Sequence, residues 1–253
     1  MKSRYKRVWI TGGTSGIGLA LARRYRAAGS AVIISARNET RLAEVAAEIG
    51  AHPLPLDVTD RDAVFAAVEK IWAEKGPLDL AVLNAGGSPT PEGGTAAILE
   101  ANLRLNLLGA AHGVDALRPR MREAGGGTIA LVASLAGYLP LPRGYGYATS
   151  KAALIHYAAG LYAELKAEGI DLRLINPGFV NTPLVQQNRF PMPFMLEPEA
   201  AAERIFRGLE GRRFEIAFPR RLAWPLRLLR ALPLNLWVQI LARAERRLKR
   251  IRE

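Results

Sequence analysis

Tyr147 and Lys151 are the two residues whose types and spacing most directly suggest chemistry. They stand four positions apart in a segment with helical spacing of apolar residues, so their side chains project from one face of a helix and can meet. A phenol titrates near pH ~10, but a neighbouring ammonium favours the phenolate and lowers its pKa. We therefore predict that Tyr147 is a general acid and base tuned by Lys151. Taken alone, the pair also fits an interface aromatic beside a solvated lysine.

A glycine-rich turn occupies Thr11–Gly18, directly after a short apolar run. Its glycines let the backbone approach a pyrophosphate closely, and the helix that follows offers amide donors and a favourable dipole. The spacing Gly-x-x-x-Gly-x-Gly fits the general dinucleotide fingerprint only loosely, and a tight turn without a ligand is the alternative. The predicted cofactor contacts in this turn are Gly12, Thr14, Ser15, Gly16, Ile17 and Gly18.

Short apolar runs alternate with longer amphipathic stretches along most of the chain, which is typical of βαβ units around a parallel sheet. The predicted strands are Arg7–Thr11, Ala31–Ala36, His52–Leu56, Leu78–Asn84, Thr128–Ser134, Asp171–Asn176 and Glu215–Phe218. The predicted helices are Ile17–Ala28, Glu39–Ile49, Arg61–Lys75, Ala97–Glu123, Tyr147–Glu168 and Glu199–Leu209, with Asn38 and Asp60 as N-caps. This pattern predicts an α/β fold with a doubly wound, parallel, seven-stranded sheet of the Rossmann type. A single domain over residues 1–219 would carry a basic amphipathic helical extension over residues 220–253.

Six sequence elements follow one another in order near the ends of predicted strands, where open α/β sheets bind ligands. They are Thr11–Gly18, Asn84-Ala85-Gly86, Asn106, Ser134, Tyr147-Ala148-Thr149-Ser150-Lys151 and Pro177-Gly178. Together they resemble the signature of the short-chain dehydrogenase/reductase superfamily, over about residues 7 to 218. The resemblance implies an oxidoreductase that transfers hydride between a nicotinamide cofactor and a carbonyl or secondary alcohol.

The resemblance also implies roles for the remaining polar residues. Ser134 would donate to the substrate carbonyl oxygen, and Asn106 would hold a water that links Lys151 to solvent. Lys151 would also bind the nicotinamide ribose. For Ser134 the alternative is a strand-end serine that caps a loop, and Ser150 is a rival for its role. For Asn106 the alternative is a solvated helix asparagine, and Asn102 lies nearby in the sequence.

The end of the second predicted strand favours NADP(H) over NAD(H). An NAD enzyme usually places a carboxylate there, whereas this chain has Ala36 followed by Arg37, which can pair bidentately with a 2′-phosphate. Many NADP-preferring relatives carry another basic residue in the glycine turn, where this chain has Ser15. The other predicted cofactor contacts are Asn38, Asp57, Val58, Asn84, Ala85, Gly86, Pro177, Gly178, Val180 and Thr182, besides Tyr147 and Lys151.

Large apolar residues in a Pro- and Asn-rich segment predict a substrate flap over residues 178–198. This apolar set includes Phe190 and, before the flap, Leu141, and it indicates an apolar, bulky substrate, with a lipid-derived carbonyl as one candidate. The predicted substrate contacts are Leu139, Tyr145, Phe179 and Leu184. The chain has no cysteine and three histidines without metal-ligand spacing, so we expect no metal site. No signal-peptide pattern is visible, and a cytoplasmic location is the default expectation.

The basic charge is concentrated at the C-terminal end. Residues 212–253 hold twelve Lys or Arg against three Asp or Glu, which is +9 of the formal +12. An apolar seam through Leu234, Trp237, Leu241, Ala244, Leu248 and Ile251 either packs on the protein or a sister subunit, or lies in a lipid headgroup layer at a membrane surface.

Three further expectations concern partners and rival functions. Relatives commonly form homodimers or homotetramers through the helices that correspond to Ala97–Glu123 and Tyr147–Glu168. A catalytically silent NAD(P)-binding regulator would commonly lose the tyrosine, which this chain keeps. A nucleic-acid-binding protein could use the basic tail, but no recognition motif is visible, so we expect no nucleic-acid partner.

Overall fold

Seven parallel strands form the centre of the molecule. The computed structural model describes residues 2–140, 144–186 and 192–250, and of residues 244–250 only the backbone. The strands are β1 (Arg7–Thr11), β2 (Ala31–Ser35), β3 (His52–Pro53), β4 (Leu80–Leu83), β5 (Gly127–Val132), β6 (Ile170–Pro177) and β7 (Glu215–Phe218). Their order in the sheet is β3-β2-β1-β4-β5-β6-β7, so the chain winds outward in both directions from β1 and β4. The predicted doubly wound sheet is confirmed.

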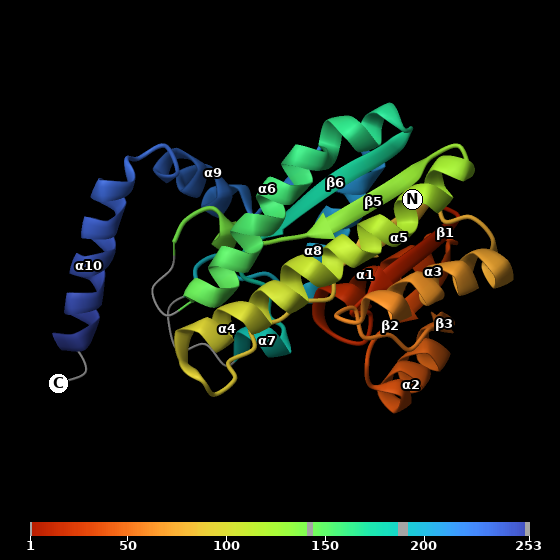
Figure 1. Ribbon diagram of the computed structural model, residues 1–253, viewed down its shortest axis with the longest axis horizontal. Helices are drawn as coiled ribbons and strands as arrows, with labels where there is room; N and C mark the ends of the chain where they lie inside the picture. Colours follow the sequence, from red (N-terminus) through yellow and green to blue (C-terminus); the bar gives the residue numbers. More distant parts are fainter. Residues whose placement is uncertain (1, 141–143, 187–191, 251–253) are drawn as a thin grey trace.

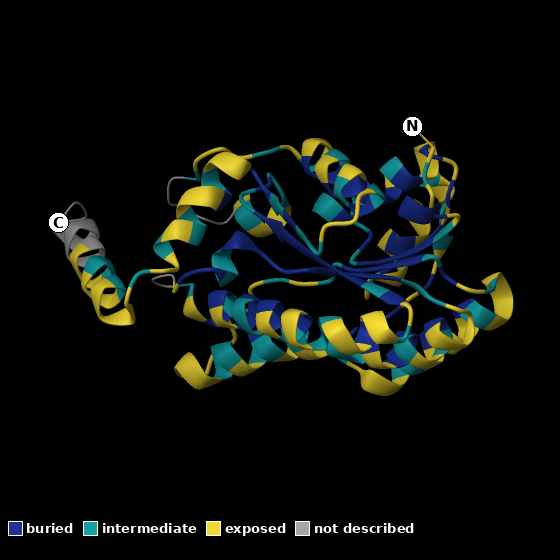
Figure 2. Cartoon of the chain, turned by 90° about the horizontal axis from the view of Figure 1, so that it is seen from above, coloured by how far each residue is buried: buried dark blue, intermediate teal, exposed yellow. Residues whose placement is uncertain are grey.

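Helices cover both faces of the sheet, as Figures 1 and 2 show. One face packs against α3 (Arg61–Lys75), α5 (Gly109–Glu123) and α6 (Tyr145–Ala167). The other packs against α1 (Gly16–Ala27), α2 (Glu39–Ile49) and α8 (Pro198–Glu210). Buried strand residues alternate between these two cores, because neighbouring side chains of a strand point to opposite faces. Figure 2 shows the buried strands between the two helical layers.

Local sequence signals explain most of the boundaries. The side chains of Asn38 and Asp60 accept from the backbone amides of Arg41 and Ala63, at 2.9 and 3.0 Å, and cap α2 and α3 as predicted. Strand β3 ends at Pro53, earlier than the predicted Leu56, because Pro53 and Pro55 have no backbone N–H. Leu54 and Leu56 still donate to β2 and to Ala36, so the segment stays beside the sheet.

The predicted helix Ala97–Glu123 is three elements. It comprises α4 (Gly94–Leu103), a π-helical turn η1 (Arg104–Leu108) and α5. The π turn coincides with Asn106, whose side chain is buried and bonded outside its own helix. Such turns are frequent at functional sites.

The C-terminal extension forms two helices, α9 (Arg220–Leu229) and α10 (Leu234–Arg250). Leu222, Leu226 and Leu229 of α9 pack against the larger core, as does Trp237 of α10. Figure 1 shows α10 set apart from the body, at the end toward which β5 points. Within the described residues, no helix is long and apolar enough to cross a membrane.

Candidate active site

The glycine turn forms a cradle at the carboxyl ends of β1 and β2. Gly12 and Gly16 have positive φ angles of 67° and 51°, which L side chains rarely adopt. A Cβ on Gly18 would lie 2.1 Å from the carbonyl oxygen of Gly12, so only glycine lets α1 start this close to the turn. Ser15, the N-cap of α1, is exposed and makes no side-chain capping bond. The first amides of α1 therefore lack a cap from Ser15, and a helix N-terminus of this kind can bind a pyrophosphate.

Asn84 joins the end of β4 to this cradle. Its side-chain Nδ2 donates to the carbonyl oxygens of Thr11 and Gly12, at 3.0 and 3.2 Å. In return, Thr11 Oγ1 accepts from the backbone amides of Asn84 and Ala85, both at 3.0 Å. Asn84 thus stabilises the conformation of the glycine turn. Sequence reasoning assigned Thr11 no such part, although a hydroxyl at the last position of a strand is a usable signal.

Ser134 and Tyr147 come together at the end of β5. The Ser134 hydroxyl lies near the phenol of Tyr147 and favours its phenolate form. The Ser134 hydroxyl also accepts from Ala136 N at 3.1 Å and faces the carbonyl oxygen of Pro177 at 3.4 Å. Tyr147 lies in the first turn of α6, and Ser134 caps a short 3-10 turn, η2 (Leu135–Gly137).

Lys151 lies one turn along α6 from Tyr147, with its ammonium nitrogen 5.7 Å from the centre of the tyrosine ring. Its Nζ donates to the carbonyl oxygen of Val132 at 2.9 Å. A Cβ on Gly86 would come within 3.2 Å of the same nitrogen. Lys151 is therefore within reach of the Asn84-Ala85-Gly86 segment that borders the cradle.

Burial affects the pKa values of both residues of this pair. Burial raises the pKa of Tyr147, and the Ser134 hydroxyl opposes that shift. Burial lowers the pKa of Lys151 to about 8. Lys151 directs its hydrogen bond to Val132 O in this structure, and the predicted effect of Lys151 on the pKa of Tyr147 stays a prediction.

Asn106 connects the loop after β4 to α6. Its Oδ1 accepts from Gly87 N at 3.0 Å, and its Nδ2 donates to Gly87 O and Ser150 Oγ, at 2.9 and 3.0 Å. Both amide hydrogens are thus in use, so the side chain positions Gly87 and Ser150. Ser150, considered only as a rival to Ser134, is a partner of Asn106. Asn102 instead bonds to Pro89 O and Ile98 O, each at 2.8 Å.

The predicted adenosine-end residues lie beyond β2 and β3. Arg37 is exposed, and within the described residues it has no ion pair. The Asn38 side chain caps α2. Burial would raise the pKa of Asp57, but hydrogen bonds from Thr59 and the charges of Arg37 and Arg104 lower it overall. Val58 is buried against Gly109.

The segment after β6 returns over the cradle. Gly178 donates to Phe218 O at 2.7 Å, and buried Val180 forms an isolated bridge with Leu196. The methyl group of Thr182 would contact a Cβ on Gly16 at 2.8 Å, so Thr182 lies against the glycine turn. Of the predicted contacts after β6, Thr182 therefore reaches the cradle, whereas Gly178 and Val180 contact Phe218 and Leu196.

The predicted substrate residues fall into different environments. Tyr145 and Leu184 are exposed, whereas Leu139 is buried in the larger core and Phe179 is half-buried. In the predicted flap, Pro183–Gln186 forms the short helix α7. Leu141 and Phe190, which the sequence also suggested for the apolar lining, lie outside the described residues. Among the described residues, no group of three or more His, Cys, Asp or Glu could hold a metal ion.

Comparisons with known proteins agree with this geometry. Residues 6–192 match a family model described as short chain dehydrogenase. An oxidoreductase of Myxococcus xanthus is 34% identical over 236 residues, which are 90% of this chain and 93% of that protein. A Mycobacterium bovis protein named "Probable oxidoreductase EphD" is 38% identical over 198 residues, 74% of this chain but 33% of that protein. A short chain dehydrogenase from Burkholderia cenocepacia, solved in complex with NADP, has a TM-score of 0.81 at 23% identity, covering 95% of this chain and 99% of that one.

Proposed function

This chain belongs to the short-chain dehydrogenase family and is an oxidoreductase with a nucleotide-binding fold, and from that premise we propose that it transfers hydride between NADP(H) and the carbonyl or secondary alcohol of an apolar, lipid-derived substrate. One observation carries the proposal. Ser134 and Tyr147 lie together at the carboxyl end of the sheet, where the Ser134 hydroxyl favours the phenolate of Tyr147, and Lys151 lies one helical turn further along α6.

The proposed chemistry divides between the cofactor and the protein. A bound nicotinamide supplies or accepts the hydride. Tyr147 gives a proton to the carbonyl oxygen in reduction and takes it back in oxidation. Ser134 donates a hydrogen bond to the same oxygen, where negative charge develops. Lys151 holds a ribose hydroxyl, and its ammonium form lowers the free energy of the phenolate.

Asn106 has the part of a positioning residue in this scheme. Its side chain fixes Gly87 and Ser150, which flank Gly86 and Lys151 in the sequence. We expect the proposed water relay from Lys151 to depend on these hydrogen bonds of Asn106. The π turn at residues 104–108 interrupts the regular backbone bonding there, which is where a water would find a backbone partner.

The preference for NADP(H) rests on charge at the end of β2. Arg37 is exposed and without an ion pair among the described residues, and Ala36 replaces the usual carboxylate. Arg104 contributes a further positive charge near Asp57, from a part of the chain that sequence reasoning did not connect with this end of the site. The NADP named for the Burkholderia cenocepacia structure is in keeping with this preference.

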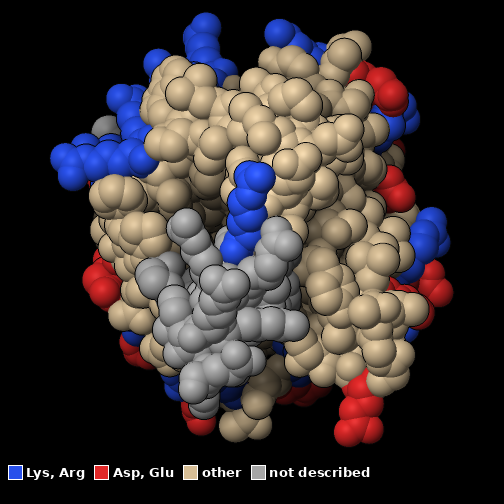
Figure 3. Space-filling view, turned by 90° about the vertical axis from the view of Figure 1, so that its left-hand side faces the viewer, with Lys and Arg blue, Asp and Glu red and all other residues tan. Residues whose placement is uncertain are grey.

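The substrate class is proposed from exposed apolar residues. Leu184, Phe194 and Met195, in the segment after β6, are each at least 40% exposed. Leu234, Leu236 and Val238 of α10 are also exposed. Figure 3 views the end of the molecule that carries α10 and shows most charged side chains at its margin. We propose that this end rests peripherally on an anionic membrane and receives its substrate there. A homodimer or homotetramer and a cytoplasmic location stay predictions.

A cofactor and substrate screen tests the proposed function. We would follow the oxidation of NADPH and NADH by the purified chain with steroids, simple ketones and acyl-chain carbonyls. The expected result is turnover that is faster with NADPH and fastest for the apolar carbonyls. Cofactor binding without turnover of any carbonyl would favour the silent regulator instead.

A further inference from the structure

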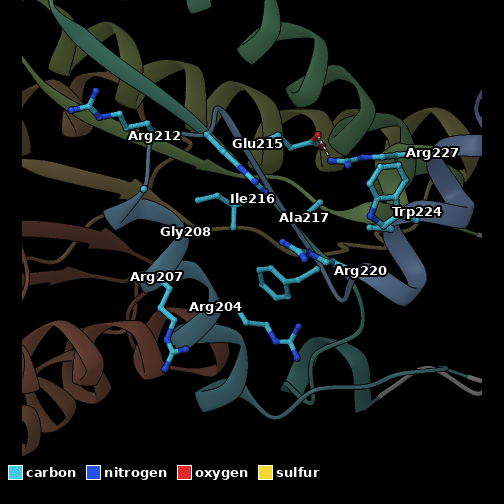
Figure 4. Close-up of a pocket in the computed structure, with 14 residues that line it drawn as sticks. Arg204, Arg207, Gly208, Arg212, Glu215, Ile216, Ala217, Arg220, Trp224 and Arg227 are labelled. Carbon is cyan, nitrogen blue, oxygen red and sulfur yellow. Dashed lines mark hydrogen bonds and ion pairs between the residues drawn. The ribbon is translucent and has the colours of Figure 1, made fainter. Parts of the chain in front are cut away.

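A groove of about 730 Å³ lies along the outer edge of the sheet, away from the residues described above. Strand β7 is the last strand of the sheet, and α8 and α9 flank it. Six arginines line the groove, namely Arg204, Arg207, Arg212, Arg213, Arg220 and Arg227. Figure 4 shows Arg204 and Arg220 extending from α8 and α9 toward the space between these helices.

Most of this positive charge is uncompensated. Arg204, Arg212, Arg213 and Arg220 make no side-chain hydrogen bond or ion pair with any described residue. Arg207 pairs with Glu203, which also pairs with Arg24. Glu215 is the one carboxylate among the residues lining the groove. The groove therefore carries positive charge without a matching carboxylate, which favours an anionic ligand.

Glu215 is already committed to other partners. Its Oε2 pairs with Arg227, and its Oε1 accepts from Tyr138 and, at 2.6 Å, from Asn176. The carboxylate therefore holds α9 to the sheet and does not neutralise the free arginines. The unpaired guanidinium groups lie at the exposed rim of the groove, so their N–H donors are available to a ligand.

The floor of the groove is apolar, and one wall is aromatic. Ile216, Ala217, Phe218 and Ala223 form part of the lining. Trp224, which is 58% exposed, stands beside Arg227 with the guanidinium carbon 5.8 Å from its ring centre. A simple inorganic ion would use only the rim. A ligand that combines a phosphate with an organic group would use the guanidinium forks, the apolar floor and the indole together.

We propose that this groove binds an organic phosphate, with the phosphate held between Arg204 and Arg220 and the organic part against Trp224. The site is separate from the cofactor cradle, whose residues do not line it. A twofold contact between two copies at this edge would bring their arginine clusters face to face, which favours a small anionic ligand over a second copy as the occupant. A soluble phosphate ester and a phospholipid headgroup share the required chemistry.

Binding measurements on the full chain test the proposal. Inorganic tripolyphosphate, titrated by calorimetry with and without excess NADPH, probes the soluble source. Vesicles of phosphatidylcholine with and without phosphatidic acid probe the headgroup source, by co-sedimentation. The test variant is Arg204→Gln with Arg220→Gln. The matched control is Arg221→Gln with Arg230→Gln, which removes the same charge from exposed residues that do not line the groove.

We expect saturable binding of at least one probe, which the test variant weakens by about tenfold or more and the control leaves nearly unchanged. Binding of tripolyphosphate alone assigns a soluble ligand, and added binding of phosphatidic acid vesicles assigns a headgroup. The proposal is overturned if neither probe binds, if the control loses as much affinity as the test variant, or if the test variant changes only the oligomeric state. NADPH oxidation should be unaffected by both variants, so this result and the proposed function can fail separately.

Discussion

Burial governs the protonation of Tyr147 and Lys151 in opposite senses. It raises the pKa of the tyrosine and lowers that of the lysine to about 8, so each is pushed toward its neutral form. Their spacing was readable from the sequence, but the balance between desolvation and charge pairing was not. In the structure Lys151 is buried, bonds to the carbonyl oxygen of Val132 and makes no ion pair with a described residue.

The shifted lysine predicts a pH dependence of stability. The pKa of Lys151 is about 8 in the folded chain, against an ordinary value of 10.5, so the unfolded chain binds more protons between these values. Stability contributed by this residue therefore rises with pH through that window, and Tyr147 opposes it only above about pH 10. Lys151→Met should remove the rise. Urea unfolding without cofactor, at neutral pH and at about pH 9.5, should show the wild type gaining on the order of 1–2 kcal/mol relative to the variant.

Lys166 provides the control for this measurement, since it lies on the same helix and is exposed. Lys166→Met should keep the wild-type pH slope. An unchanged slope in Lys151→Met would mean that the amine titrates near its ordinary value.

Tyr147→Phe tests the proton transfer itself. The change removes the hydroxyl and little surface, so NADPH affinity should be nearly unchanged while kcat falls by about 100-fold or more. Fluorescence titration of NADPH and steady-state rates measure the two effects. Tyr157→Phe, on the same helix and half-buried, should retain turnover. Most of the activity surviving in Tyr147→Phe would rule out the mechanism.

Arg37→Asp tests the choice of cofactor. The proposed pairing with the 2′-phosphate would be replaced by repulsion, so Kd for NADPH should rise by about tenfold or more while Kd for NADH changes little. Arg221→Asp changes the net charge equally, at an exposed position of α9, and should affect neither constant. Equal weakening of both cofactors in Arg37→Asp would assign Arg37 a structural part.

Among the elements, the turn between β1 and α1 depends most strictly on residue type. A Cβ at Gly18 would meet the Gly12 carbonyl at 2.1 Å, whereas a Cβ at Gly160 in α6 would meet nothing within 4 Å. Gly18→Ala should therefore destabilise the fold by about 1–3 kcal/mol and abolish cofactor binding. Gly160→Ala should stabilise it by about 1 kcal/mol, because alanine favours the helix interior. Thermal unfolding with and without NADPH measures both, and a harmless Gly18→Ala would show that the turn can rearrange.

Element boundaries were predictable where local chemistry sets them and not where tertiary contacts do. Asn38 and Asp60 cap their helices as their types and positions indicated. The π turn around Asn106 has no local signal, because Asn106 bonds to Gly87 and Ser150, which lie far from it in the sequence. The contact between Thr182 and Gly16 also has no local signal, because these residues are far apart in the sequence and only the folded sheet brings them together.

At the scale of the whole molecule, the C-terminal extension divides into two parts. Helix α9 is attached to the body, because Arg227 pairs with Glu215 and Leu226 packs against the larger core. Helix α10 is attached less, with Trp237 against the core and Leu234 and Val238 exposed. The sequence pattern placed Leu234 and Trp237 on one seam but could not divide that seam between the body and solvent. A truncation that tests the extension must therefore spare α9.

Removal of residues 234–253 should spare the fold and the cofactor site while removing most of the binding to anionic vesicles, leaving only what the arginine groove beside β7 contributes. Each basic residue near an anionic surface contributes about 1 kcal/mol and is screened by salt, so binding by the full chain should fall steeply as salt is added. Leu234→Ser with Val238→Ser keeps the charge and removes two exposed apolar side chains. It should weaken vesicle binding without lowering Tm, since neither side chain packs in the body. If the full chain ignores anionic vesicles, and the truncation instead lowers Tm or dissociates an oligomer, then α10 is a packing element and the membrane proposal is wrong.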